Sequence, residues 1–204
     1  MAQYNIIAEN ENYTIVSDYQ SAYRTSEKYQ TEAQLEQELI KNLTEQGYEY
    51  LAIHTEKDLV DNLRVQLQRL NDYTFTDSEW ERFFNDVIAN QNEGIEAKTA
   101  KIQEDHIQVL KRDTGETKNI YLIDKRNIHN NYLQVINQYE EEQGNHDARY
   151  DVSILVNGLP LVHIELKRRG VQLKEAFNQI DRYQRDSFWA GCGLYEYVQI
   201  FVIS

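Results

Sequence analysis

The stretch from residue 150 to residue 167 constrains the fold more than any other part of the sequence. Two runs of alternating side chains, 150–156 and 161–167, flank Asn157 and Gly158, a dipeptide typical of tight β-hairpin turns. Alternation places successive side chains on opposite faces of a sheet, and each run has one apolar face. That face holds Val152, Ile154 and Val156 in the first run and Val162, Ile164 and Leu166 in the second. The opposite face holds Asp151, Ser153 and Leu155, followed by Leu161, His163, Glu165 and Lys167.

The register of this hairpin decides which of these residues are neighbours. A two-residue loop pairs Val156 with Leu159 and mixes polar with apolar side chains along both faces. A three-residue loop over 157–159, or an equivalent bulge, keeps each face uniform and pairs Asp151 with Glu165. We therefore expect the second register, with Lys167 on the same face two residues beyond Glu165.

Two adjacent carboxylates suggest a site for a divalent cation, because they are costly to ionise together unless a cation neutralises them. Mg²⁺ takes one or two carboxylates together with waters and phosphate oxygens. We expect Asp151 and Glu165 to hold the metal, and Lys167 to orient a water or neutralise charge on a phosphoryl group. The alternative is a salt-bridged, exposed strand face in which Lys167 pairs with one carboxylate.

The remaining pattern predicts a mixed α/β domain. Apolar residues at helical spacing predict helices after Thr31, over 59–70 and over 171–187, and a capping box at Thr76 and Glu79 begins another. Strands are expected at 48–53, 107–109, 120–122, 132–139 and 197–203, besides the hairpin. We expect a central sheet that holds the acidic pair at one edge, with helices on both sides. Residues 1–30, which show no clear periodicity, are expected to form an arm before a domain over 31–204.

The charge of the chain is strongly asymmetric. The formal net charge is −13, yet residues 161–204 carry +1, so the first 160 residues carry −14. This excess argues against a general polyanion binder and places any contact with an anionic ligand in the last quarter of the chain. The candidates for phosphate contacts are Arg168, Arg169, Lys174, Arg182 and Arg185. A solvated helix face is the alternative for these five residues.

Targeting signals and cysteine frameworks are absent from the sequence. No apolar run approaches a membrane span, and the first 30 residues lack a secretory signal. The lone Cys192 cannot form an internal disulfide. We therefore expect an intracellular, soluble protein that makes no contact with a membrane.

Several motifs, taken in order, resemble a known family. Asp151 followed by Glu165-Leu-Lys is similar to the Asp…(Asp/Glu)-x-Lys signature of restriction-endonuclease-like nucleases, although Tyr150 stands where that signature usually has proline. Gln179 and Tyr183 match the Gln-x-x-x-Tyr motif of the branch that includes RecB-type nucleases. The wider sequence resembles the N-terminal domain of the restriction (R) subunit of type I restriction-modification enzymes. The segments that carry this resemblance are 32–36, 47–51, 90–94, 119–124, 159–170 and 188–189.

The resemblance implies a Mg²⁺-dependent endonuclease domain with a restriction-endonuclease-like core, acting on double-stranded DNA in the prokaryotic cytoplasm. It implies catalytic roles for Asp151, Glu165, Lys167, Gln179 and Tyr183. It also places Glu36 where many nucleases of this fold carry a further acidic residue.

The resemblance further implies an ATP-driven translocase after the domain, and modification and specificity subunits that recognise the DNA, with cleavage away from the recognition site. The 204 residues contain no Gly-x-x-x-x-Gly-Lys-Ser/Thr loop, so ATP is expected only through the motor. The chain stops inside an expected strand, which suggests the N-terminal piece of a longer protein. Two alternatives remain, a non-catalytic docking module and a stand-alone repair or recombination nuclease of the same fold.

Overall fold

The structure is a computed structural model that describes residues 5–9, 14–17, 30–141, 148–167 and 193–203. The helices are α1 (Glu32–Glu45), α2 (Glu56–Asn71), α3 (Asp77–Phe83), the π-helix η1 (Phe84–Ile88), α4 (Ile95–Gln103), and the 3₁₀ helices η2 (Ile128–Asn130) and η3 (Leu194–Tyr197). The strands are β1 (Asn5–Glu9), β2 (Thr14–Ser17), β3 (Glu49–Tyr50), β4 (Ile107–Lys111), β5 (Thr117–Tyr121), β6 (Leu133–Glu141), β7 (Ala148–Val156), β8 (Leu159–Glu165) and β9 (Ile200–Ile203).

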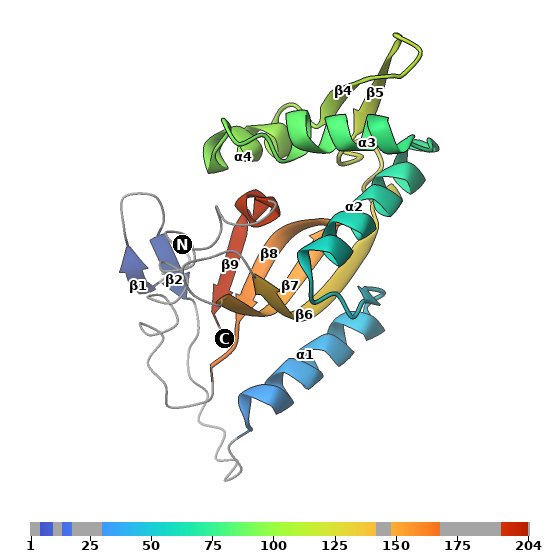
Figure 1. Cartoon of the computed structure of the whole chain (residues 1–204). Coiled ribbons are helices and arrows are strands. Elements are labelled where there is room, and N and C mark those ends of the chain that lie inside the picture. Colours follow the sequence, from blue (N-terminus) through green and yellow to red (C-terminus); the bar gives the residue numbers. More distant parts are fainter. Residues whose placement is uncertain (1–4, 10–13, 18–29, 142–147, 168–192, 204) are drawn as a thin grey trace.

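A mixed five-stranded sheet forms the centre of the molecule, with the strand order β3-β6-β7-β8-β9 (Figure 1). The pairs β3–β6 and β8–β9 are parallel, and the pairs β6–β7 and β7–β8 are antiparallel. Helices α1 and α2 cover opposite faces of this sheet, because each contributes apolar side chains to a different core cluster. The expectation of a mixed α/β domain with helices on both sides is confirmed. Among the described helices, none has the length and apolar character that a membrane crossing requires.

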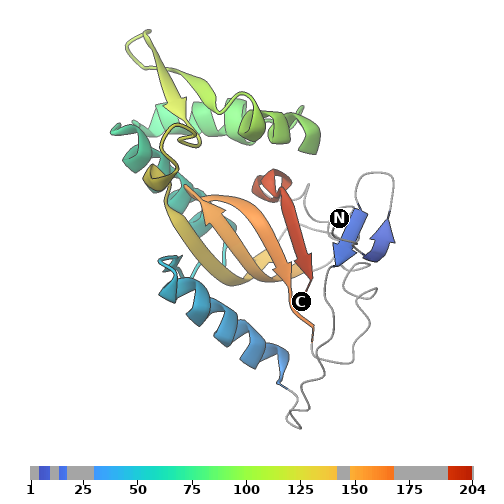
Figure 2. The ribbon, with the colours of Figure 1, turned by 180° about the vertical axis from the view of Figure 1, so that it is seen from behind.

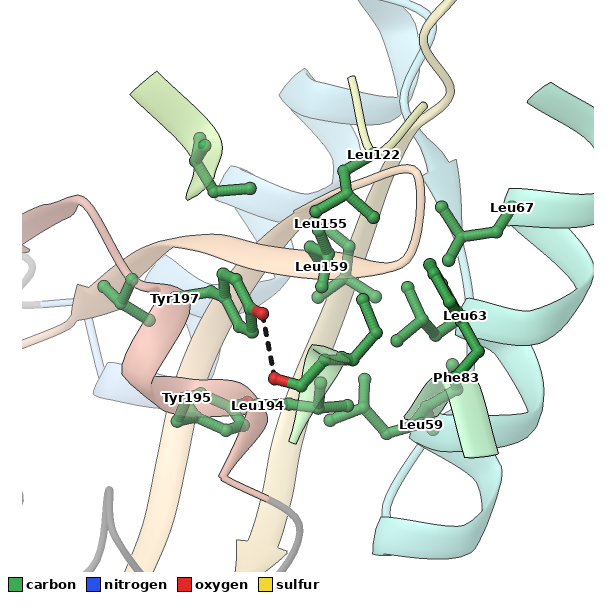
Figure 3. Close-up of a cluster of buried hydrophobic side chains, with 14 of the residues drawn as sticks. Leu59, Leu63, Leu67, Phe83, Leu122, Leu155, Leu159, Leu194, Tyr195 and Tyr197 are labelled. Atoms are coloured by element: carbon green, nitrogen blue, oxygen red, sulfur yellow. Dashed lines mark hydrogen bonds between the residues drawn. The ribbon is translucent and has the colours of Figure 1, made fainter. Parts of the chain in front are cut away.

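The larger core lies between α2 and the β7–β8 hairpin. Leu59, Leu63 and Leu67 of α2 have no exposed surface and pack in one cluster with Leu155 and Leu159 (Figure 3). On the other face, α1 contributes the stripe expected from its sequence to a smaller cluster with strands β6, β7 and β8. That stripe consists of Leu35, Leu39, Ile40 and Leu43. The two apolar helix faces therefore fix both sides of the sheet.

The capping box at Thr76 forms as expected and also attaches α3 to the β4–β5 hairpin. The buried carboxylate of Glu79 accepts hydrogen bonds from the Thr76 and Asp113 backbone N–H groups. The Asp113 carboxylate accepts from the hydroxyls of Thr76 and Ser78 and from Arg82. These hydrogen bonds lower the pKa of Asp113 to about 2, because they favour its ionised form.

The turn between β7 and β8 has two residues, so the expected three-residue loop is wrong. Asn157 and Gly158 have φ values of +51° and +84°, the conformation that a tight type I′ turn requires, and Val156 pairs with Leu159. The register then shifts beyond Leu155, and Ile154 pairs with Val162, which leaves one extra residue in β8. This bulge is the equivalent that the sequence permits, and it restores the uniform faces.

Contacts with neighbouring segments select the short turn. The Asn157 side chain donates to the Leu122 carbonyl at 3.0 Å and accepts from the Tyr132 N–H at 2.8 Å. Gly158 lies against α2 so closely that a Cβ atom would stand 2.6 Å from the Leu63 Cα. No longer loop is needed, because the bulge corrects the register after the turn.

Three elements differ from the expectations or were missed. Strands β1 and β2 form a separate two-stranded sheet within the first 30 residues. Helix α4 was missed because its buried face includes a lysine, Lys98, which interrupts the apolar pattern. The expected strand over 197–203 begins later, at Ile200, because residues 194–197 form η3 with all four side chains buried. The expected helix over 171–187 lies outside the described residues.

A comparison of two glycines tests the packing of the turn. Gly158→Ala is expected to lower the free energy of unfolding by about 1–2 kcal/mol from its left-handed backbone and about 1–3 kcal/mol more from overpacking against Leu63. Gly115 has a similar φ of +86° but open space around it, so Gly115→Ala should show only the first loss. Urea denaturation measures both. Equal losses would contradict the close approach of α2 to the turn.

Candidate functional site

Asp151 on β7 and Glu165 on β8 lie across from each other on neighbouring strands. The register pairs Ser153 with His163 and Val152 with Ile164, so the next position along brings Asp151 opposite Glu165. This part of the sequence prediction is confirmed. The position in the sheet differs from the expectation, because β7 and β8 are the third and fourth of five strands and β9 adds beyond β8 (Figure 2).

Glu165 is a fully buried carboxylate at the end of β8, with 0% of its surface exposed. Its Oε1 accepts a hydrogen bond from the Lys167 ammonium at 2.6 Å. Its Oε2 lies 3.5 Å from Nε2 of His163, which is also buried. The Lys167–Glu165 pair occurs as the alternative reading anticipated, but the strand face is not exposed. Burying a carboxylate is costly, so this arrangement calls for compensating positive charge.

Asp151 is half-buried, and its Oδ2 accepts a hydrogen bond from the Leu166 backbone N–H at 2.9 Å. Burial raises the pKa of Asp151 to about 6, and the negative charge of Glu165 raises it further in the same direction. The Leu166 hydrogen bond and the charge of Lys167 oppose this shift. Two carboxylates that raise each other's cost of ionisation are thus held side by side.

The donor set suits a hard divalent cation with several waters. The described residues include no group of three or more His, Cys, Asp and Glu side chains placed to hold a metal ion. Within the same residues, Oε2 of Glu165 has no hydrogen-bond donor. A cation between Asp151 and Glu165 would neutralise both, and Mg²⁺ is commonly bound by only one or two carboxylates. The residues present therefore fit Mg²⁺ better than Zn²⁺, which prefers four protein ligands of the nitrogen and sulfur type.

A stack of tyrosines supports the site from the α2 side of the sheet. The Tyr150 ring stacks on Tyr195 with centroids 4.3 Å apart, and Tyr139 stacks on Tyr195 at 5.0 Å. The Ser153 hydroxyl lies 3.0 Å from the Tyr195 hydroxyl, and the His163 ring meets Tyr150 edge-on. Tyr150 thus fills the position where the nuclease signature usually has proline. Sequence reasoning missed Tyr195, because no local pattern connects it with a strand 45 residues away.

The segment that carries Tyr195 is held by a buried ion pair. The Lys98 ammonium of α4 contacts the Glu196 carboxylate and donates to the Gly193 carbonyl, and both side chains are buried. The Tyr197 hydroxyl donates to the Ile88 carbonyl at 2.8 Å (Figure 3). Helix α4 therefore positions η3, and η3 positions the tyrosine beside the site.

The other residues named from the sequence fall into two groups. Glu36 of α1 accepts hydrogen bonds from the side chains of Asn137 and Gln138 on β6, one at each carboxylate oxygen. The remaining ones lie outside the described residues, so their placement stays a prediction. These are Gln179, Tyr183, Arg168, Arg169, Lys174, Arg182 and Arg185.

Removal of the lysine should reveal the cost of the buried carboxylate. Lys167→Met is expected to lower the free energy of unfolding by about 1–3 kcal/mol, because Glu165 loses its closest cation. The matched control is Lys57→Met, since Lys57 pairs with Asp61 on the surface of α2 with 82% of its side chain exposed. That control should change stability by less than about 0.5 kcal/mol. Similar losses in both variants, measured by urea denaturation, would contradict the burial of Glu165.

Comparisons with known proteins identify the family. Residues 29–204 match the family described as "Type I restriction enzyme R protein N terminus". The chain is 47% identical over 199 residues to the "Type I restriction enzyme EcoprrI endonuclease subunit" of Escherichia coli, covering 97% of this chain and 63% of that protein. It is 40% identical over 181 residues to the "Type I restriction enzyme SsaAORF53P endonuclease subunit" of Staphylococcus saprophyticus, covering 86% and 18%. A protein of Staphylococcus aureus, the "Type I restriction enzyme SauCOLORF180P endonuclease subunit", is 39% identical with the same coverage.

The chain thus spans 63% of the length of the first of these relatives and 18% of the others. The match extends over helices and strands on both sides of the sheet and includes the β7–β8 hairpin. By this similarity the chain belongs to the family of N-terminal domains of type I restriction enzyme R subunits.

Proposed function

We propose that this chain is the DNA-cutting domain of a type I restriction enzyme and hydrolyses phosphodiester bonds. The observation that carries the proposal is the pair Asp151 and Glu165, held on adjacent strands with Lys167 bonded to Glu165. The relatives named as endonuclease subunits support the same conclusion. The corresponding core is the restriction-endonuclease-like one, with α1 and α2 on opposite faces of the sheet.

In this proposal Asp151 and Glu165 hold Mg²⁺. The bound metal supplies Lewis acidity toward a phosphate oxygen and lowers the pKa of a bound water. The Leu166 N–H orients Asp151, and the burial of Glu165 excludes bulk water from one side of the site. Lys167 neutralises negative charge at the phosphoryl group. Gln179 and Tyr183 would complete the site, and Arg168, Arg169, Lys174, Arg182 and Arg185 would contact phosphates.

The longer relatives suggest how the domain works. Since the chain spans only part of their length, we propose that an ATP-driven motor follows it, and that modification and specificity subunits recognise the DNA. Cleavage then occurs away from the recognition site, where the motor delivers the DNA. A docking module without catalysis and a stand-alone repair nuclease remain the alternatives that experiments must exclude.

Substitution of the acidic pair in the complete enzyme tests the cutting role. With ATP and Mg²⁺, Asp151→Asn is expected to reduce DNA cleavage by about 10²-fold or more while ATP hydrolysis and assembly continue, because the metal site loses a charged ligand. Lys167→Met should also abolish cleavage, and Lys57→Met should cut normally. Normal cleavage by Asp151→Asn would favour the docking module. Independent cutting by a preparation that lacks the motor would favour the stand-alone nuclease.

The charge distribution predicts weak DNA binding by the 204-residue chain alone. Non-specific affinity arises from basic side chains that displace counterions, and here only residues 161–204 have a positive net charge. The dissociation constant for duplex DNA at physiological salt should be no tighter than about 10⁻⁶ M. Cleavage by this chain alone should be slow, and attachment to the motor should restore it by raising the effective DNA concentration. Nanomolar binding in a fluorescence titration would contradict this view of the charge.

A further inference from the structure

We propose that Glu36 is a positioning residue: through Gln138 it maintains a break in the side-chain alternation of β6 and β7 that directs Asp151 toward Glu165. This inference rests on the proposed function of the acidic pair. It concerns how the fold places Asp151, and it gives Glu36 no contact with metal or substrate.

The break is visible first in β6. Val135 packs in the cluster beneath α1, and Ile136 packs in the cluster beneath α2, as alternation requires. Tyr139 lies on the same face as Ile136, although the two are three residues apart. Between them Gln138 has a φ of +53°, a left-handed conformation that is unfavourable for any residue with a side chain. One left-handed residue therefore shifts the alternation of β6 by one position.

Strand β7 contains the same shift at the same level of the sheet. Tyr150 and Ser153 both contact Tyr195 on the α2 side, although they too are three residues apart. Val152, between them, packs in the α1 cluster. Asp151 is consequently the residue that falls outside the alternation.

The two shifts face each other. Asn137 pairs with Val152, and Tyr139 pairs with Tyr150, so Gln138 lies opposite Asp151. With both strands shifted together, Tyr139 and Tyr150 enter the core as a stacked pair with centroids 6.0 Å apart. Asp151 is released from either face, and its Oδ2 reaches the Leu166 N–H beside Glu165. The left-handed residue of β6 is thus coupled to the direction of the acidic side chain.

Glu36 compensates for the unfavourable backbone. Its Oε1 accepts from the Asn137 side chain at 2.5 Å, and its Oε2 accepts from the Gln138 side chain. Asn137 is held from a second side by the Tyr50 hydroxyl at 2.9 Å, and the Gln138 carbonyl lies 3.3 Å from Nδ1 of His54. Glu36 is the residue among these that contacts both side chains at the break. Because both of its oxygens bind amides, it acts through β6.

A rescue experiment separates this role from a general loss of stability. In the intact enzyme, Glu36→Ala is expected to lower the DNA cleavage rate by about 10–100-fold, with ATP hydrolysis unchanged. Glycine adopts positive φ without penalty, so Gln138→Gly needs no support from Glu36. The double variant Glu36→Ala/Gln138→Gly should therefore recover most of the cleavage rate. A metal ligand or an ordinary packing residue would not be rescued by a glycine in the middle of a strand.

Two further variants complete the comparison. Glu36→Gln keeps one acceptor oxygen and should retain more activity than Glu36→Ala. Glu45→Ala removes an exposed carboxylate of the same helix that pairs only at 3.7 Å with Lys41, and it should cut like the unmodified enzyme. If Glu36→Ala cuts normally, or if Gln138→Gly fails to restore cutting, the positioning role of Glu36 is overturned.

A readout independent of cleavage tests the geometry itself. Hydrogen–deuterium exchange of the peptide that contains the Leu166 amide reports whether Asp151 still accepts its hydrogen bond. Exchange should accelerate in Glu36→Ala and slow again in the double variant, and unchanged exchange would overturn the inference. If exchange responds in this way but Asp151→Asn still cuts DNA, the proposed function has failed, and the failure is not one of positioning.

Discussion

The close approach of Gly158 to helix α2 is the contact on which the site depends. It sets a two-residue turn between β7 and β8, because only a glycine at positive φ leaves room for the Leu63 backbone. A two-residue turn alone would place the wrong faces together, and the bulge after Leu155 corrects this within one step. The packing of α2, the turn and the bulge together bring Asp151 opposite Glu165.

Unfavourable features gather at one level of the sheet. Glu165 is buried with its charge, the pKa of Asp151 is raised, and Gln138 has a left-handed backbone opposite Asp151. Proteins tolerate such features where the surrounding structure compensates for them, and they concentrate at functional sites. Here the compensation comes from α1, from the tyrosine stack and from Lys167. Stability at this level of the sheet is given up for the placement of two carboxylates.

Distant segments contribute to this compensation through buried polar contacts. The Lys98–Glu196 pair joins α4 to η3, and Tyr195 of η3 contacts Tyr150 and Ser153 beside the acidic pair. A buried ion pair adds little net stability when compared with apolar packing, but it requires one specific arrangement of its partners. The domain therefore uses buried charge to fix the geometry of η3, while α2 and the hairpin supply the apolar core.

The sequence by itself determined the uniform faces of the hairpin, the pairing of Asp151 with Glu165 and the apolar stripe of α1, because these follow from side-chain periodicity and solvent exclusion. It also determined the capping box at Thr76, which is a local interaction. Only the tertiary structure decided the length of the turn, the interior position of the acidic pair and the burial of Glu165. It likewise decided helix α4 and the left-handed Gln138, whose partners Glu196 and Glu36 lie about a hundred residues away along the chain. Periodicity reports which side of an element faces the core, whereas contacts between segments far apart decide what each buried polar group meets there.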